Sequence, residues 1–146
     1  MPDFALSPHF TFQELTASEI ALRHGIANVP GEQEIENLRY LASMLEQVRA
    51  LLGHPIHVNS GFRCLAVNAL VGSKPTSAHV KGLAADIVCP EFGPPQKIVD
   101  AIVASAIDYD QVIVEYDRWV HIGFAPAGET NRRQKLVING LGHPFS

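Results

Sequence analysis

The longest periodic segment of the chain, residues 32–52, places the strongest constraint on the fold. Apolar residues recur in it at steps of three and four, the spacing that aligns side chains along one face of a helix. These residues are Ile35, Leu38, Leu41, Leu45, Val48 and Leu52. Pro30-Gly31 precedes the segment and Gly53 follows it, which favours a helix from Glu32 to Leu52. Because one apolar stripe on a small domain is normally covered by that domain's own sheet, we predict a core-packing helix.

Four shorter segments have the composition of strands and supply the predicted sheet. One starts at His57 and runs into a turn at Gly61, and the others span residues 83–89, 111–116 and 119–124. A second long helix is expected after Gly93-Pro94-Pro95, since proline is tolerated in the first helical turn. The predicted fold class is α+β, with a small antiparallel sheet, helices packed on one face and a cleft on the other.

Short helical segments are expected at three further places. Thr11 and Glu14 have the spacing of a capping box, which predicts the start of a helix. A helical turn is expected over residues 18–24 and a short helix over residues 64–71, each ended by a glycine. These segments carry structural information and say nothing about chemistry.

Composition restricts the class of protein. With 146 residues, 47% apolar and 18% charged, the chain fits one folded domain over residues 1–146. The formal net charge of −4 disfavours a nucleic-acid binder, since such proteins usually carry a basic face. No segment approaches the roughly eighteen uninterrupted apolar residues of a membrane span, and the N-terminus lacks a signal-peptide pattern. We therefore expect no membrane segment, synthesis in the cytoplasm and no export by the usual route.

The two cysteines, Cys64 and Cys89, are isolated in the sequence. They do not form a Cys-x-x-Cys pair, so neither a disulfide scaffold nor a thiolate zinc site follows from them. Reduced, partly buried thiols are the favoured interpretation. A single Cys64–Cys89 bridge is the alternative that the sequence leaves open.

His79 and Asp86 stand seven positions apart and form half of a candidate metal site. Neutral imidazole and carboxylate oxygen are ligands that Zn²⁺ accepts. Strand alternation after Leu83 directs Asp86 to one face of the sheet and Cys89 to the other, which argues against Cys89 as a further ligand. A histidine and an aspartate at this distance also occur by chance, so the pair needs a third ligand and a base.

The hairpin between residues 111 and 124 supplies a third ligand and a base, provided that its loop has an odd number of residues. A two-residue Asp117-Arg118 loop would place Val114 opposite His121 and turn Glu115 away. A three-residue loop would place Glu115 opposite His121. Asp-Arg lacks the preference of Asn-Gly for positive φ, so the two-residue loop is poorly encoded.

With Glu115 and His121 on one face, a complete catalytic zinc site is predicted. His79, Asp86 and His121 would hold Zn²⁺ and leave its fourth position for water. Glu115 would accept the proton as that water attacks a carbonyl. Arg63, just past the turn at Gly61, is favoured by its position alone as a surface arginine paired with an acid, although its planar fork would suit a carboxylate in a cleft.

The motifs that carry these residues resemble those of the zinc D-alanyl-D-alanine carboxypeptidases. The matching stretches are Ser60-Gly61-Phe62-Arg63, Ser77-Ala78-His79-Val80-Lys81-Gly82-Leu83-Ala84-Ala85-Asp86 and Trp119-Val120-His121. That family also contains D-Ala-D-Ala dipeptidases and phage L-alanyl-D-glutamate endolysins, and it shares its fold with the hedgehog signalling domain. The resemblance extends from Ser7 to Gln134, nearly the whole chain.

The resemblance implies a role for each matching residue. His79, Asp86 and His121 correspond to the zinc ligands, Arg63 to an arginine that binds a substrate carboxylate or helps to polarise the scissile carbonyl, and Ser77 to a serine lining the substrate cleft. Some members carry the catalytic acid three residues before the last histidine, where this chain has Arg118. Glu115 is favoured as the base, and Asp117 is the alternative.

The expected function is zinc-dependent hydrolysis of an amide bond in peptidoglycan stem peptides, as in a D-Ala-D-Ala carboxypeptidase. One alternative is a phage-type endopeptidase that cuts L-Ala-D-Glu or a cross-bridge. Another is a non-catalytic, zinc-stabilised binding module of hedgehog-like fold. The expected cofactor is Zn²⁺ and the expected partner a peptidoglycan peptide, and the protein is expected to be a monomer. It would act on the cell wall if it is derived from a phage or prophage and released.

Overall fold

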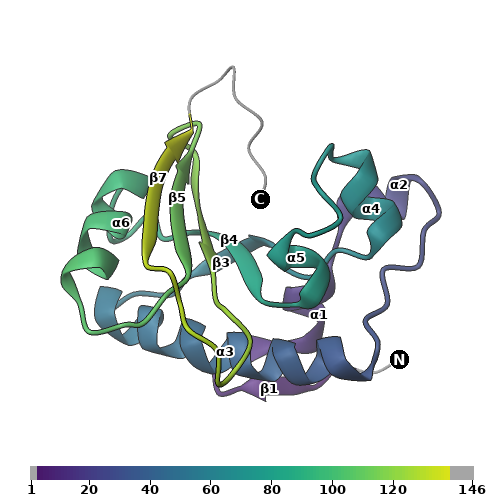
Figure 1. The fold of residues 1–146 in the computed structure, drawn as a ribbon, viewed down its shortest axis with the longest axis horizontal. Helices are drawn as coiled ribbons and strands as arrows, with labels where there is room; N and C mark the ends of the chain where they lie inside the picture. The colour runs from purple at the N-terminus through teal and green to yellow at the C-terminus, as the bar shows by residue number, and fades with distance from the viewer. Residues whose placement is uncertain (1–2, 139–146) are drawn as a thin grey trace.

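A five-stranded sheet forms the centre of the protein in the computed structural model, which describes residues 3–138 (Figure 1). Its strands lie in the spatial order β3 (His57–Ser60), β4 (Ala84–Val88), β6 (Trp119–Gly123), β5 (Gln111–Glu115) and β7 (Gln134–Ile138). The first four are mutually antiparallel, and β7 joins the edge parallel to β5. The predicted antiparallel sheet is therefore confirmed. The parallel edge strand was not predicted, because residues 134–138 do not alternate between apolar and polar side chains.

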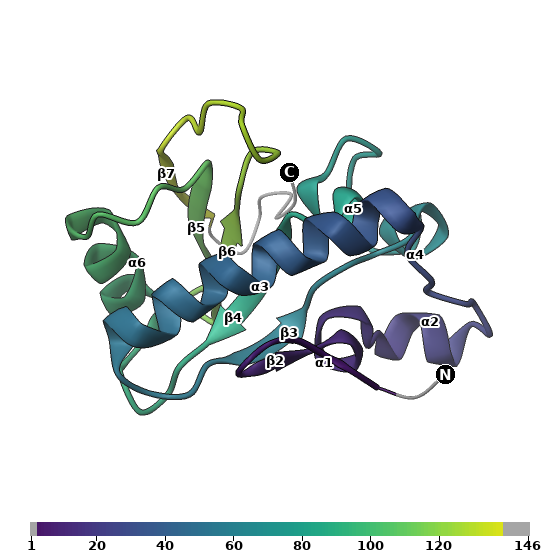
Figure 2. The same ribbon diagram turned by 90° about the horizontal axis from the view of Figure 1, so that it is seen from below.

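Helices α3 (Glu32–Leu52) and α6 (Pro95–Ala104) cover one face of this sheet. Figure 2 shows α3 running across the sheet, with α6 at one end. The core between them is apolar and contains, among others, Leu41, Leu45, Val48, Ile98, Ile102, Ile87, Val112, Val120 and Ile122. Helix α3 has the predicted bounds, and Gly53 ends it with a φ of 72°. Helix α6 begins with proline in its first turn, also as predicted.

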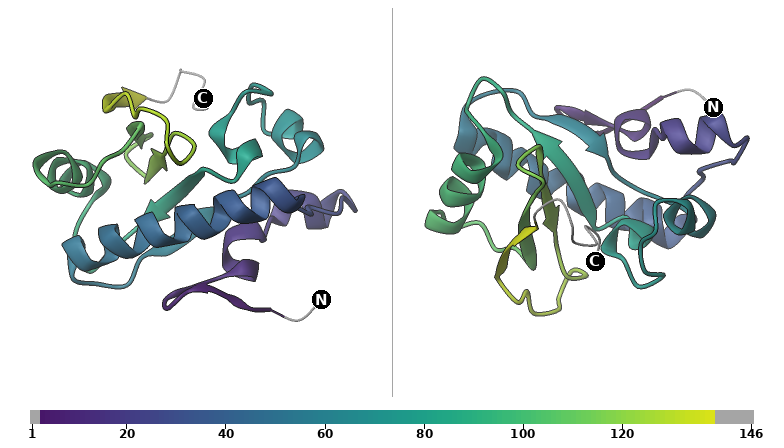
Figure 3. Two further views of the ribbon diagram at one scale, coloured as in Figure 1. Left: turned by 60° about the horizontal axis from the view of Figure 1, so that its bottom comes forward. Right: turned by 90° about the horizontal axis from the view of Figure 1, so that it is seen from above.

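A two-stranded hairpin of β1 (Ala5–Ser7) and β2 (Phe10–Thr11) lies beside α3 (Figure 3). The Ser7 hydroxyl donates to Glu46 of α3 at 2.6 Å, and the backbone N–H of His9 donates to the same carboxylate at 2.7 Å. The hairpin leads into α1 (Phe12–Thr16), which starts with the predicted capping box of Thr11 and Glu14. Its contacts fasten the N-terminal part of the described chain to the long helix.

The remaining helices are short. Helices α2 (Glu19–Arg23) and α4 (Leu65–Leu70) fall within the predicted segments. Helix α5 (Ala78–Lys81), for which no helix was predicted, is a single turn. Both cysteines are free thiols, as favoured: Cys89 is buried in the core, where it donates to the Pro55 carbonyl at 3.3 Å, and Cys64 is half-buried. Of the helices within residues 3–138, none is long and apolar enough to cross a membrane.

Candidate metal centre

Three buried side chains converge on the sheet face opposite α3 and α6. They are His79 of α5, Asp86 of β4 and His121 of β6. His79 Nε2 lies 3.2 Å from Asp86 Oδ1 and 3.2 Å from His121 Nδ1, and His121 Nδ1 lies 3.2 Å from Asp86 Oδ1. The three donor atoms therefore form an almost equilateral triangle.

Sheet register and one tight helical turn bring these residues together. Strands β4 and β6 pair Asp86 directly with His121, so both side chains leave the same face side by side. Ser77 caps α5 at its start, and Gly82 ends it with a φ of 75°. A Cβ at Gly82 would lie 2.9 Å from the Glu34 carbonyl oxygen of α3. Glycine thus lets the turn pack closely on α3, which places His79 over the sheet.

A backbone hydrogen bond sets the orientation of His79. Its Nδ1 lies 2.7 Å from the carbonyl oxygen of Gly61. A carbonyl only accepts, so Nδ1 carries the hydrogen and Nε2 presents its lone pair to Asp86 and His121. Gly61 is itself constrained, because a Cβ there would collide with the Leu15 carbonyl oxygen. The close approach of α1 to the end of β3 therefore supports the imidazole.

The donor set fits a zinc ion. A tetrahedral Zn²⁺ with bonds of about 2.0–2.1 Å separates its ligand atoms by about 3.3 Å, close to the observed triangle. Burial lowers the pKa of His79, which keeps the imidazole neutral as a ligand must be. Burial opposes ionisation of Asp86, but the hydrogen bond with His121 favours the carboxylate, and the pKa of the carboxyl lies well below its usual range. An imidazole lone pair and an anionic oxygen thus point at one position, which favours a cation there.

The hairpin that carries His121 has a three-residue loop of Tyr116, Asp117 and Arg118. The N–H of Arg118 donates to the Glu115 carbonyl at 3.0 Å, and the φ angles of Tyr116 and Asp117 are 57° and 55°, as a type I′ turn requires. The predictions of an odd loop and of Glu115 on the face of His121 are confirmed. The predicted direct opposition is wrong, because the strand ends one residue earlier than expected: Ile113 pairs with His121, and Glu115 with Trp119.

Glu115 is buried beside the triangle. Its Oε1 accepts a hydrogen bond from Trp119 Nε1 at 3.2 Å, and within residues 3–138 its Oε2 has no hydrogen-bond partner. Burial, and then the negative charge of Asp86, raise the pKa of Glu115 to about 8. Asp117 is exposed in the turn. Of the two acids, Glu115 therefore has the surroundings of a functional carboxyl.

Arg63 is buried, with only 4% of its surface exposed, so its position next to a glycine turn did not make it a surface residue. Burial lowers its pKa, and the charges of Asp86 and Glu115 oppose that shift. The backbone N–H of Arg63 donates to the His79 carbonyl at 3.1 Å, which ties the loop of Arg63 to α5. Arg63 and Asp86 line a pocket of about 330 Å³ together with Trp119, Ser60 and residues of α2 and α4.

Ser77 is fully buried, and its hydroxyl accepts a hydrogen bond from the backbone N–H of His79 at 3.2 Å. This contact starts α5 and so helps to place His79. The contact of Ser77 with a substrate stays a prediction, as do the roles of Arg63, Glu115 and the three metal-site residues.

Three supporting residues escaped the sequence analysis. Trp119, which the sequence analysis names only within a motif, pairs with Glu115 across the hairpin and donates a hydrogen bond to its carboxylate. The Gly61 carbonyl that orients His79 has no signal in the sequence. Asn28 donates to the carbonyls of Thr16 and Phe62 and accepts from the N–H of Cys64, so it fastens the loop that carries Arg63. Such an anchor is visible only after folding.

Comparison with known proteins agrees with this site. A family model described as Peptidase M15 matches residues 8–123, most of the chain and all of the residues that build the candidate metal centre. No curated protein matches the chain. The resemblance drawn from the three motifs is thus confirmed at the level of the family.

Proposed function

The chain belongs to the Peptidase M15 family, and from this premise we propose that it uses zinc to hydrolyse an amide bond in a peptidoglycan stem peptide. Membership of the family implies a metallopeptidase that acts on peptidoglycan-like substrates. The observation that carries the proposal is the triangle of His79 Nε2, Asp86 Oδ1 and His121 Nδ1. Glu115 on the same sheet face supports a catalytic rather than a structural zinc ion.

The chain's own groups supply binding and proton transfer in this proposal. A zinc ion held by the triangle would act as a Lewis acid on the scissile carbonyl and lower the pKa of a water molecule. Glu115 Oε2, which has no partner within residues 3–138, would accept the proton of the attacking water and pass it to the leaving amine. Trp119 fixes the other oxygen, so the carboxylate keeps one orientation.

Glu115 must be ionised to act as a base. With a pKa of about 8 in the metal-free centre, it is largely protonated at pH 7. A divalent cation beside it favours the ionised form, because opposite charges attract. Metal loading and activation of the base would therefore be coupled.

Arg63 supports D-Ala-D-Ala carboxypeptidase action as the preferred activity. Its guanidinium lies at the pocket beside Asp86, where it would hold the terminal carboxylate of the substrate in a bidentate pair. An endopeptidase that cuts L-Ala-D-Glu or a cross-bridge is the second candidate. Action on the cell wall after release from a phage- or prophage-carrying cell belongs to the same proposal, as does a hedgehog/DD-peptidase-like fold.

Digestion of purified peptidoglycan tests the proposal. Zinc-loaded protein is incubated with the polymer between pH 5 and 9, and the released fragments are identified by mass spectrometry, with chelator-treated protein as the control. Release of free D-alanine is the expected result, whereas larger peptide fragments would identify an endopeptidase. An uncut polymer at every pH would refute the enzyme proposal and favour a zinc-stabilised binding module.

A further inference from the structure

A second pocket lies on the same sheet face, on the other side of His121 from Arg63. Side chains alternate along a strand, so β6 presents Trp119, His121 and Gly123 to this face in steps of two. Trp119 lines the pocket of Arg63, and Gly123 lines the second pocket. The candidate metal centre therefore lies between two pockets, whose lining residues Trp119 and Gly123 are about 13 Å apart along β6 at 3.3 Å per residue.

The floor of the second pocket adjoins the metal centre. It includes Ala78, which precedes His79, and Leu83, whose carbonyl accepts from the N–H of Phe124 at 2.9 Å. A Cβ at Gly123 would lie 3.4 Å from His121 Nε2. Because glycine has no side chain, no side-chain atoms at position 123 separate the pocket from the imidazole of His121. A ligand in this pocket would thus lie beside the ring of His121, which is part of the candidate metal centre.

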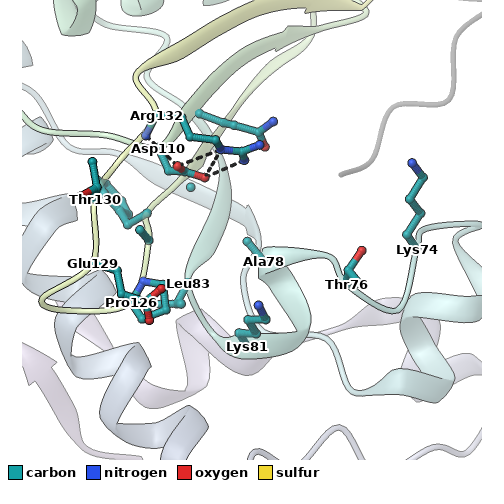
Figure 4. A pocket seen from close by; sticks show the side chains of 14 residues that line it. Lys74, Thr76, Ala78, Lys81, Leu83, Asp110, Pro126, Glu129, Thr130 and Arg132 are labelled. Atoms are coloured by element: carbon teal, nitrogen blue, oxygen red, sulfur yellow. Dashed lines mark hydrogen bonds and ion pairs between the residues drawn. The ribbon is translucent and has the colours of Figure 1, made fainter.

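The walls of this pocket of about 430 Å³ are positively charged on balance (Figure 4). Lys74 and Lys81 lie along one wall, and Arg132, Asp110 and Glu129 along the opposite one. Arg132 neutralises Asp110 through hydrogen bonds of 2.7 and 3.0 Å. Neither lysine forms an ion pair within the described part of the chain. Once Arg132 and Asp110 are paired, the ammonium groups of Lys74 and Lys81 outnumber the single carboxylate of Glu129. The pocket is therefore positive, although the whole chain has a net charge of −4.

We propose that this pocket is a substrate subsite in which Lys74 and Lys81 bind a carboxylate of the peptide, on the side of the scissile bond away from Arg63. The inference rests on the proposed function. An extended peptide that follows β6 would span both pockets, with its scissile bond over the metal centre. Ammonium groups at a pocket wall pair with a carboxylate and select against its uncharged amide.

Binding of three synthetic stem pentapeptides tests the subsite without requiring turnover. The parent contains D-glutamate and meso-diaminopimelate with free carboxylates, and in each of the other two one of these carboxylates is amidated. Affinities are measured by calorimetry on the zinc-loaded Glu115→Gln protein. We expect one amidation to weaken binding roughly two- to fivefold, as for a solvent-accessible charge pair. When Lys74→Gln and Lys81→Gln are added to the Glu115→Gln protein, the difference in affinity between the parent and the amidated peptide should disappear.

Lys97→Gln/Lys135→Gln is the matched control, because it removes two positive charges on the α6 side of the molecule, away from the pocket. It should keep the preference for the free carboxylate. The inference is overturned if neither amidation weakens binding, or if the preference survives in the Lys74→Gln/Lys81→Gln protein. Hydrolysis by the wild-type protein is measured separately: carboxylate-dependent binding without any cleavage would support the subsite and refute the peptidase.

Discussion

At the scale of single residues, Glu115 and Asp117 show how two acids two positions apart acquire different chemistry. The turn exposes Asp117 at a positive φ, while Glu115 ends β5 on the buried face beside the candidate metal centre. Only Glu115 combines burial, a fixing hydrogen bond and an oxygen without a partner in residues 3–138. The strand register, and not the residue type, separates their roles.

Glu115→Gln should keep zinc and lose most of the turnover. The amide preserves the volume and the hydrogen bond from Trp119 but cannot accept the proton, so kcat should fall by roughly 10² or more. Peptide hydrolysis is followed by mass spectrometry, and bound zinc by atomic emission.

Asp117→Asn is the matched control and should retain activity, because that side chain is exposed in the turn. If Asp117→Asn were inactive and Glu115→Gln active, the base would be Asp117. Loss of zinc from Glu115→Gln would instead make Glu115 a ligand.

The raised pKa of Glu115 predicts a pH-dependent stability difference in the metal-free protein. The unfolded carboxyl ionises near 4.5, whereas the folded one ionises near 8. Between these values the folded state binds the extra proton, so the free energy of unfolding of the wild type falls as pH rises. Glu115→Gln removes this dependence. Melting temperatures of metal-free wild type and Glu115→Gln should therefore diverge from pH 5 to pH 8 in favour of the variant, and a constant difference would contradict the assignment.

At the scale of elements, α5 is notable because a single helical turn carries a candidate ligand. So short a helix is not stable by itself. The Ser77 cap, the close approach of Gly82 to α3 and the hydrogen bond between Arg63 N–H and the His79 carbonyl hold it in place. The position of His79 therefore depends on contacts at both ends of the turn.

Ser77→Ala distinguishes a cap from a substrate contact. Loss of the hydrogen bond to His79 N–H should lower the free energy of unfolding by about 1 kcal/mol, as for other helix caps. Urea denaturation measures this change, and steady-state kinetics should show a KM close to that of the wild type. Unchanged stability with a raised KM would instead support the predicted contact of Ser77 with the substrate.

At the scale of the whole molecule, the candidate metal centre links parts of the chain that are distant in sequence. His79, Asp86 and His121 come from a helix and two neighbouring strands, and the Gly61 carbonyl connects them to the end of β3. A zinc ion bound to the folded state alone stabilises it by mass action.

Removing zinc should therefore lower the melting temperature by roughly 5–10 °C, the shift expected when free zinc exceeds its dissociation constant about a hundredfold. Calorimetry before and after chelation measures the change, and added zinc should reverse it. Asp86→Asn, which removes the anionic candidate ligand, should abolish the zinc-dependent rise in melting temperature. A melting temperature that does not respond to zinc in the wild type would count against the metal centre.

Local patterns in the sequence determined a large part of this fold and site. The bounds of α3, the capping box of α1 and the opposite faces of Asp86 and Cys89 all follow from periodicity and from groups within one turn of each other. The nature of the candidate site follows from its donors, because two imidazoles and a carboxylate are a zinc-binding set wherever they meet.

Only the tertiary structure decided how those donors meet. The Tyr116-Asp117 turn has no Asn-Gly signal, and it is held by pairing of β5 with β6 and by the bond from Tyr116 N–H to the Ile138 carbonyl of β7. Long-range packing likewise buries Arg63 and brings Lys74 and Lys81 across from Arg132. Register and burial depend on free energies shared by segments far apart in the chain, which no local pattern contains.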